Sequence, residues 1–324
     1  MLSRVADSIY WLNRYVERSE NVARFVDVNL NLMLDLPAGV EQQWRPLVVT
    51  TGDLDRFEKS YGEATAENVV RFLTFDRDYP NSILSCIRFA RENARSVREI
   101  ISSEMWEDLN SFYLFVTDTE SQLQENPSLM DSSEFLHKFF RIVKLASHRF
   151  CGIMDATMSH NEGWHFGQMG RLLERADKTA RILDVKYYIL LPSAHWVGTP
   201  LDQIQWMALL KSASAYEMYR KCQHRIVPSC VADFLIFNRE FPRSIYFCIR
   251  QVEQSLHQVT GIPAGTWSTS AERALGRMSS RLGYTTIEDV IEIGLHEFLD
   301  RTQLELNQVG NEITSVFFQT YSVS

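Results

Sequence analysis

One charged pattern occurs twice in this chain of 324 residues. The first copy, Arg14–Glu20, reads RYVERSE, and the second, Arg171–Asp177, reads RLLERAD; both continue to Ala-Arg and then to Asp-Val. The central glutamates, Glu17 and Glu174, lie 157 positions apart. A repeat of this length indicates a duplicated half-domain rather than a solenoid of short units.

A second pattern repeats in the same order along the chain. Residues 72–88 begin FLTFDRDYP, and residues 234–250 begin FLIFNREFP, at an offset of 162 positions. The two offsets differ by about five residues, which is an ordinary length for a loop between helices. We therefore expect one pseudo-symmetric domain over residues 1–324, with internal repeats of approximately 1–160 and 161–324.

Hydrophobic periodicity predicts helices along nearly the whole chain. From Val5 to Met33 the apolar positions follow steps of four and three, which is typical of a long amphipathic helix over residues 3–35, and a similar helix is expected over 161–191. Strand patterns of period two are nearly absent. The sequence predicts an all-α, multi-helix bundle built from two pseudo-symmetric repeats. Further helices are expected over 40–49, 66–75, 81–101, 104–125, 132–158, 201–223, 229–237, 243–259, 271–282 and 286–318.

Composition restricts the partners and the compartment. The formal charge of −8 and the pI near 5.6 argue against a nucleic acid or an anionic membrane as partner, because both need a concentrated basic surface. Five cysteines without a Cys-x-x-Cys pair favour reduced thiols in a cytoplasmic protein, with Cys86 and Cys248 as small buried residues. Residues 1–7 lack the apolar core of a signal peptide, and no stretch approaches the roughly 20 apolar residues of a membrane span.

Both copies of the charged pattern align their charges along one edge of the apolar face of the predicted helix. A pair such as Glu20 and Arg24 stabilises a helix by about 0.2–0.5 kcal/mol, which is too little to explain why the charges are kept in both copies. We interpret them as a buried ion-pair network that fixes how the two halves dock, and a ligand-binding role for some of them is the alternative. The expected network comprises Arg14, Glu17, Arg18, Glu20, Arg24, Asp27, Arg171, Glu174, Arg175, Asp177, Arg181 and Asp184.

A densely charged helical face distinguishes the first repeat from the second. The second repeat keeps Arg250 but has no counterpart of the other arginines. Four arginines on one face can bind carboxylates or phosphates bidentately, whereas a solvated, salt-bridged helix surface is the alternative reading. The candidate ligand- or anion-binding residues are Arg88, Arg91, Glu92, Asn93, Arg95, Arg98, Trp106, Glu107 and Asn110.

Motifs that would identify an enzyme are missing from the sequence. No hydrolase elbow, phosphate-binding loop or dinucleotide fingerprint is present, and the spacing of Asp155, His160, Glu162 and His165 matches no metal site. We predict no metal and no cofactor, and we do not favour catalysis. If the protein is an enzyme, its general acid or base is expected among Glu17, Glu174 and Glu107, although such a group needs a raised pKa and neighbouring arginines lower it.

The motif Pro80-Asn81-Ser82 opens one predicted helix, and Pro242-Arg243-Ser244 opens another. Free backbone N–H groups at the first helix could hold an anion near Arg77 and Arg88. Because the arrangement recurs in both repeats, helix capping is the favoured interpretation.

The chain resembles the bacterial alpha-E domain family, named for its helical content and its Glu-Arg motif. One departure is Asn13, where the family more often has glycine before the arginine. The residues that carry the resemblance, in collinear order over most of the chain, are Met1 to Trp11, Arg14, Glu17-Arg18, Glu20-Asn21, Ala90 to Arg95, Val97-Arg98-Glu99, Glu104, Trp106-Glu107, Asn110, Trp164, Phe166, Gly170-Arg171 and Glu174 to Asp177.

The resemblance implies an all-helical protein that acts beside other proteins. Members of the family are typically encoded next to a circularly permuted ATP-grasp protein and a transglutaminase-like protein, and are proposed to take part in forming or processing a peptide. ATP-grasp enzymes activate a carboxylate as an acyl phosphate for attack by an amine. The expectation is a non-catalytic helical partner or peptide-binding subunit of such a ligase; an enzyme in its own right and a purely structural bundle are the alternatives.

Overall fold

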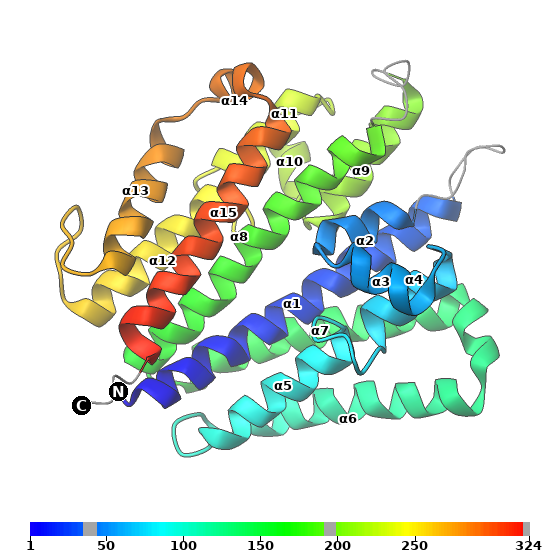
Figure 1. The fold of residues 1–324 in the computed structure, drawn as a ribbon, viewed down its shortest axis with the longest axis horizontal. Helices are drawn as coiled ribbons and strands as arrows, with labels where there is room; N and C mark the ends of the chain where they lie inside the picture. Colours follow the sequence, from blue (N-terminus) through cyan, green and yellow to red (C-terminus); the bar gives the residue numbers. More distant parts are fainter. Residues whose placement is uncertain (35–43, 191–198, 320–324) are drawn as a thin grey trace.

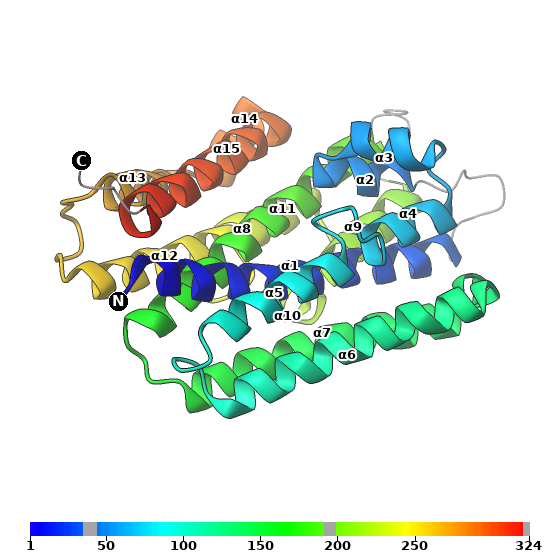
Figure 2. The same ribbon diagram turned by 60° about the horizontal axis from the view of Figure 1, so that its bottom comes forward.

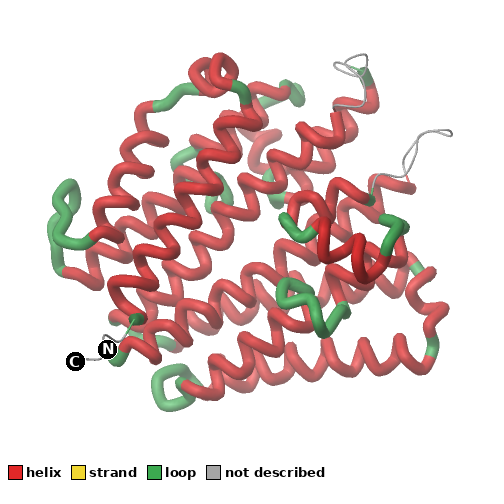
Figure 3. Tube along the Cα trace, in the orientation of Figure 1, coloured by secondary structure: helices red, strands yellow, loops and turns green. Residues whose placement is uncertain are grey.

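The protein is all-α, as the sequence predicts. The computed structural model describes residues 1–34, 44–190 and 199–319, and in these ranges every regular element is a helix (Figure 3). None of the helices in the described ranges has the length and apolar character that crossing a lipid bilayer requires.

Two long helices form the centre of the molecule: α1 (Ser3–Leu34) and α8 (Glu162–Leu190). They run side by side in the same direction and diverge toward their C-terminal ends (Figure 1). At the end where both begin, the amino group of Met1 lies 2.7 Å from the carboxylate of Glu162. The contact between α1 and α8 is the most extensive of any helix pair in the described part of the chain.

Each central helix carries its own group of three long helices, as Figures 1 and 2 show. In the first group, α5 and α7 pack on α1, and α6 packs on both of them; in the second, α12 and α15 pack on α8, and α13 packs on both of them. Two hydrophobic cores follow this division, except that Ala6 and Tyr10 of α1 belong to the second core. The bounds are α5 (Ile83–Ser96), α6 (Ser103–Glu125), α7 (Ser133–Thr157), α12 (Ile245–Thr260), α13 (Ser270–Tyr284) and α15 (Leu295–Ile313).

The shorter helices connect the two groups. Helix α2 (Arg45–Thr51), from the first half of the sequence, packs on α8, and α9 (Pro200–Ser212), from the second half, packs on α1. Each half therefore contacts the long helix of the other, although a duplication as the origin of this arrangement stays a prediction. The remaining short elements are α3 (Leu54–Tyr61), α4 (Ala66–Thr74), η1 (Pro127–Asp131), α10 (Tyr216–Cys222), α11 (Pro228–Phe237), α14 (Ile287–Ile293) and η3 (Thr314–Phe318).

Glycines on α8 allow α1 to approach closely. A Cβ atom at Gly170 would meet the carbonyl oxygen of Tyr10, and one at Gly167 would lie 2.7 Å from the side-chain nitrogen of Asn13. Backbone atoms move only together with their helix, so any larger residue at position 170 requires the two helices to separate. The close contact in turn brings the charged residues one to two turns further along into reach of each other.

Several predicted helix boundaries are wrong. The helix expected over 201–223 is divided at Ser214, which has a φ of 52°, and the helix expected over 286–318 is divided at Gly294, which has a φ of 104°. The helix expected over 81–101 ends at Ser96, and helix α3 was not predicted at all. The expected helix over 40–49 begins only at Arg45, and its residues 40–43 lie outside the described ranges.

The proline-led motifs cap helices, as predicted. The Ser82 hydroxyl accepts a hydrogen bond from the backbone N–H of Ser85 at 3.1 Å, and the Ser244 hydroxyl accepts one from that of Phe247 at 3.1 Å. All five cysteines are unpaired, and Cys86 and Cys248 are buried, as predicted for these two residues.

Candidate functional site

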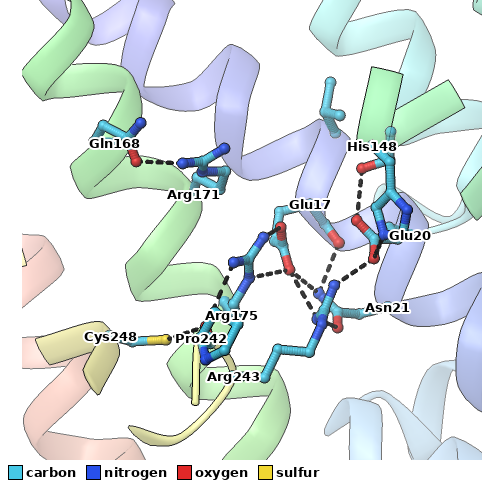
Figure 4. A network of polar contacts seen from close by, with 12 residues as sticks. Glu17, Glu20, Asn21, His148, Gln168, Arg171, Arg175, Pro242, Arg243 and Cys248 are labelled. Carbon is cyan, nitrogen blue, oxygen red and sulfur yellow. Dashed lines mark hydrogen bonds and ion pairs between the residues drawn. The ribbon is translucent and has the colours of Figure 1, made fainter. Parts of the chain in front are cut away.

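The two glutamates of the repeated pattern lie at the contact between α1 and α8, and their side chains are fully buried. Arg175 of α8 donates to both oxygens of Glu17 at 3.0 and 2.7 Å, as Figure 4 shows. Arg18 of α1 donates to both oxygens of Glu174 at 2.7 and 2.9 Å. Each copy of the pattern thus supplies the arginine that binds the glutamate of the other copy.

Beyond the reciprocal arginine, each of the two glutamates contacts different cationic side chains. Glu174 also accepts a hydrogen bond from Arg14 at 2.9 Å, and the Lys178 ammonium lies 3.5 Å from it. Glu17 instead receives Arg243, which comes from the start of α12 and donates at 3.1 Å (Figure 4). Because these side chains come from two helices and one turn, the glutamates join α1, α8 and the residues preceding α12.

Glu20 lies one turn beyond Glu17 and connects the centre to α7. Its carboxylate accepts hydrogen bonds from Arg24 at 2.8 and 2.7 Å and from the Ser147 hydroxyl at 2.7 Å, and it is in contact with Arg243. The His148 ring nitrogen lies 3.0 Å from it. On α8 the corresponding residue is Asp177, which Arg181 and Lys178 contact at 2.9 and 3.1 Å.

The outer aspartates do not join the central network. Asp27 lies 2.5 Å from His137 and 2.6 Å from Lys144, both on α7. Asp184 lies 2.7 Å from His296 and 3.4 Å from the side-chain nitrogen of Gln303, both on α15. These aspartates attach each central helix to its own flanking helix.

Arg171 also differs from the expected arrangement. Although it corresponds in sequence to Arg14, it donates to the side-chain oxygen of Gln168 at 2.5 Å (Figure 4). The prediction of one twelve-residue network is therefore too simple. The structure contains a central cluster at the α1–α8 contact and two outer aspartates with separate partners. Arg171 contacts Gln168 within α8.

Electrostatics keep the buried glutamates ionised. Burial by itself would raise the pKa of Glu174, but the charges of Arg18, Lys178 and Arg14 outweigh it and hold the pKa well below its usual range. For Glu17, burial is likewise outweighed by Arg175 and Arg243, so its pKa is lowered. A general acid must hold a proton near neutral pH, and these two carboxylates do not.

Several residues of the cluster were not in the predicted set. Arg243 and Lys178 supply charge, while Asn21 and Asn81 supply amides: Asn21 donates to Glu17 at 2.9 Å, and Asn81 accepts from Arg18 at 2.5 Å. The sequence did carry a signal, because positions 81 and 243 are equivalent in the two repeats, and so are positions 21 and 178. In each pair one copy has an amide and the other has a cation.

The arginine face of the first repeat lies along α5 and the start of α6, apart from the central cluster. Arg91 donates to the Asn110 side chain at 2.8 Å, and its guanidinium lies over the rings of Trp106 and Tyr113, at 5.5 and 4.8 Å from their centres. Arg98 also lies over the Trp106 ring, 4.8 Å from its centre. The structure therefore brings Arg91, Arg98, Trp106 and Asn110 together.

Other predicted members of this face are more peripheral. Arg88 lies over the ring of Phe89 at 5.0 Å rather than against Trp106. Glu92 contacts Arg91 at 3.2 Å and Arg95 at 3.6 Å, and the Arg95 side chain is 69% exposed. Asn93 is partly exposed and Glu107 is exposed. In the described ranges, no group of three or more His, Cys, Asp or Glu side chains is placed to hold a metal ion.

Comparison with known proteins identifies a family but no characterised relative. The model of the Alpha-E family, described as "A predicted alpha-helical domain with a conserved ER motif", matches residues 1–318. Uncharacterised proteins of Mycobacterium bovis and of two strains of Mycobacterium tuberculosis are each 22% identical over 337 residues, covering 96% of this chain and 36% of the relative. The chain thus spans about a third of the length of these curated relatives. No solved structure matches it.

Proposed function

Because the chain belongs to the Alpha-E family, we propose that it is a non-catalytic helical partner of an ATP-grasp type peptide or amide ligase, and that it binds that ligase or its acidic peptide. The ligase is proposed on the sequence resemblance, which also suggests a transglutaminase-like protein as a further partner. The structural support is the arginine face, defined as Arg91, Arg95, Arg98, Trp106 and Asn110.

Arg91 of the arginine face is held in place before any partner arrives. Arg91 is fixed by the hydrogen bond to Asn110 and by the rings of Trp106 and Tyr113, while Arg95 projects into solvent. Arginine and aromatic residues are enriched among the side chains that contribute most to protein–protein binding. Guanidinium groups bind carboxylates bidentately, which suits an acidic peptide or an acidic patch of the ligase.

The buried glutamates support a binding role over a catalytic one. Glu17 and Glu174 each accept hydrogen bonds from two or more cationic side chains, and their pKa values are lowered. The competing hypothesis, in which one of them transfers a proton, requires a pKa near neutrality. Glu107 is exposed on α6 and has no ion pair among the described residues, so the geometry offers it no activating neighbour.

The length of the relatives is a second line of support. The region similar to this chain makes up 36% of each curated relative, so nearly two-thirds of those proteins consists of other sequence. Some relatives join this kind of domain covalently to other sequence. That arrangement is consistent with a domain that works beside another polypeptide.

Binding to a cognate ATP-grasp type ligase tests the proposal. The wild-type chain is titrated against the purified ligase, and the ligase activity is measured with and without it. The double variant Arg91→Gln, Arg95→Gln is expected to bind at least tenfold more weakly. Arg301→Gln serves as the control, because the Arg301 side chain on α15 is 66% exposed, close to the 69% of Arg95, and also belongs to an ion pair within its helix.

Three results would count against the proposal. Lack of association, together with ligase activity that is indifferent to this protein, would remove the partnership. Equal binding by the double variant and the wild type would remove the arginine face as the binding surface. Unchanged cellular function in the double variant would favour the third hypothesis, a purely structural bundle.

A further inference from the structure

Positive charge exceeds negative charge in the central cluster, although the whole chain carries a formal charge of −8. Seven cations contact four carboxylates, leaving an excess of three positive charges among side chains that are each at least 79% buried. Uncompensated charge in such surroundings is costly, so the cluster favours the arrival of an anion. The cations are Arg14, Arg18, Arg24, Arg175, Lys178, Arg181 and Arg243, and the carboxylates are Glu17, Glu20, Glu174 and Asp177.

The excess is greater on the side of Glu174. There, Glu174 and Asp177 face four cations, namely Arg14, Arg18, Lys178 and Arg181. On the side of Glu17, two carboxylates face three cations. The nearest further acid on the Glu174 side is Asp53, which accepts hydrogen bonds from Tyr79 and Asn81 at 2.8 and 3.3 Å, and counting it still leaves positive charge in excess.

A cleft opens at the side where the excess lies. It is formed between α1, α2, α8 and the residues preceding α5, and its cavity volume is about 30 Å³. Three of its lining residues are the cations Arg18, Lys178 and Arg181, and others are Thr50, Tyr79 and Asn81. Arg181 uses Nε for Asp177 and Nη1 for the carbonyl oxygen of Thr50, which leaves its Nη2 with hydrogens to donate.

In the second half of the chain, an arginine occupies the position equivalent to Asn81. Arg243 occupies the sequence position of Asn81, and its guanidinium reaches Glu17, Glu20 and Asn21. Asn81 is shorter, and its amide oxygen accepts from Arg18 instead. In the first half the cation comes instead from Lys178, at the position equivalent to Asn21, and the cleft lies between Lys178 and Asn81.

An apolar chamber adjoins the cationic cleft. The two share Phe25, Thr50 and Ile182, and the chamber has a cavity volume of about 60 Å³. Its walls come from α1, α2, α8 and α9 and are mainly aliphatic, but Asn29 also lines it. The side-chain nitrogen of Asn29 is buried and has no hydrogen-bond partner among the described residues.

We infer that this cleft and chamber together bind an oxyanion with an apolar body, with its carboxylate or phosphate group held by Arg18, Lys178 and Arg181. Two arginines and a lysine supply charge-assisted donors for either anion. Phe25 and Ile182 line both the cleft and the chamber. They therefore lie at the junction between the charged group of the ligand and its apolar body. The site lies at the N-terminal end of α5, whereas the arginine face lies at its C-terminal end, so the inference is independent of the proposed ligase partnership.

Calorimetric titration of the full chain, without any ligase, tests the site with hexanoate, hexyl phosphate, inorganic phosphate and hexanol. One or both of the amphiphilic anions are expected to bind saturably and at least tenfold more tightly than phosphate or hexanol. Comparison of hexanoate with hexyl phosphate decides which oxyanion the site prefers.

Two variants connect the binding to the site. Lys178→Asn introduces the residue found at the equivalent position 21, and Asn81→Arg introduces the residue found at the equivalent position 243; each is expected to weaken binding at least tenfold. Lys59→Asn makes the same charge change at an exposed position of α3 and is expected to bind as the wild type does. Thermal unfolding of each variant verifies that it is folded.

Two outcomes would overturn the inference. One is the lack of saturable binding of either amphiphilic anion to the wild-type protein. The other is equal affinity in the wild type and in folded Lys178→Asn and Asn81→Arg, which would place any binding elsewhere. Binding of inorganic phosphate as tightly as hexyl phosphate would remove the apolar chamber from the site.

Discussion

Arg175 on α8 donates to both carboxylate oxygens of Glu17 on α1, at 3.0 and 2.7 Å, and both side chains are buried. Arg18 and Glu174 repeat this geometry in the opposite direction. A bidentate arginine–carboxylate pair restricts both distance and orientation, so two reciprocal pairs determine how the helices align. Buried ion pairs contribute more to such specificity than to net stability, but the removal of one partner is costly.

Glu174→Gln tests that cost. The substitution leaves Arg14, Arg18 and Lys178 without their common carboxylate, and we expect the free energy of unfolding to fall by about 3–5 kcal/mol. Urea denaturation measures this change in the free energy of unfolding. Glu67→Gln is the control, because its pair with Arg71 is exposed, and a change below about 1 kcal/mol is expected there. Similar values for the two variants would contradict the interpretation.

Stability is expected to depend on pH in the acid range. The pKa values of Glu17, Glu20, Glu174 and Asp177 are lowered in the folded protein because neighbouring cations outweigh their burial. The unfolded chain binds protons near pH 4, before the folded protein does, so the stabilisation is complete above about pH 5 and is lost as the pH falls toward the folded pKa values. Urea denaturation at a series of pH values should show this loss, with a smaller slope in Glu174→Gln. Parallel profiles would refute the assignment.

Gly170→Ala should separate the central helices. Its Cβ would meet the carbonyl oxygen of Tyr10, and we expect the free energy of unfolding to fall by about 1–3 kcal/mol, as for other overpacked sites. The matched change is Gly152→Ala on α7, where a Cβ meets nothing within 4 Å. Alanine is favoured over glycine in a helix by about 0.5–1 kcal/mol, so that variant should be at least as stable as the wild type. Denaturation curves of the two variants compare them directly.

Thiol reactivity should follow burial. Burial raises the pKa of Cys86 and of Cys248 to about 12, so almost no thiolate is present at neutral pH, whereas Cys222 is exposed. A thiol reagent added to the native protein is expected to label Cys222 first and to reach Cys86 and Cys248 only after unfolding. Peptide mass mapping at successive times reads out the order. Early labelling of Cys86 would show that the packing at the start of α5 is open.

Local patterns in the sequence were sufficient for the fold class and for most helices. The apolar steps of α1 and α8, and the serine caps of α5 and α12, depend on neighbours within a few positions, so they can be recognised without tertiary contacts. Two of the errors, at Ser214 and Gly294, occurred where backbone conformation interrupts a helical pattern. Ser214 adopts a positive φ that an L-residue seldom has, and no residue type in that segment announced it.

The repeated Glu-Arg pattern by itself indicated buried pairing between the two halves, because a charge kept in both copies on the edge of an apolar face needs a partner. Only the tertiary structure decided which partner each charge has. Arg175 binds Glu17 across the interface, Arg243 reaches the same glutamate from the start of α12, and Asp27 pairs away from the centre. These contacts join residues up to 226 positions apart, and they depend on how closely α1 and α8 pack, which helical periodicity does not specify.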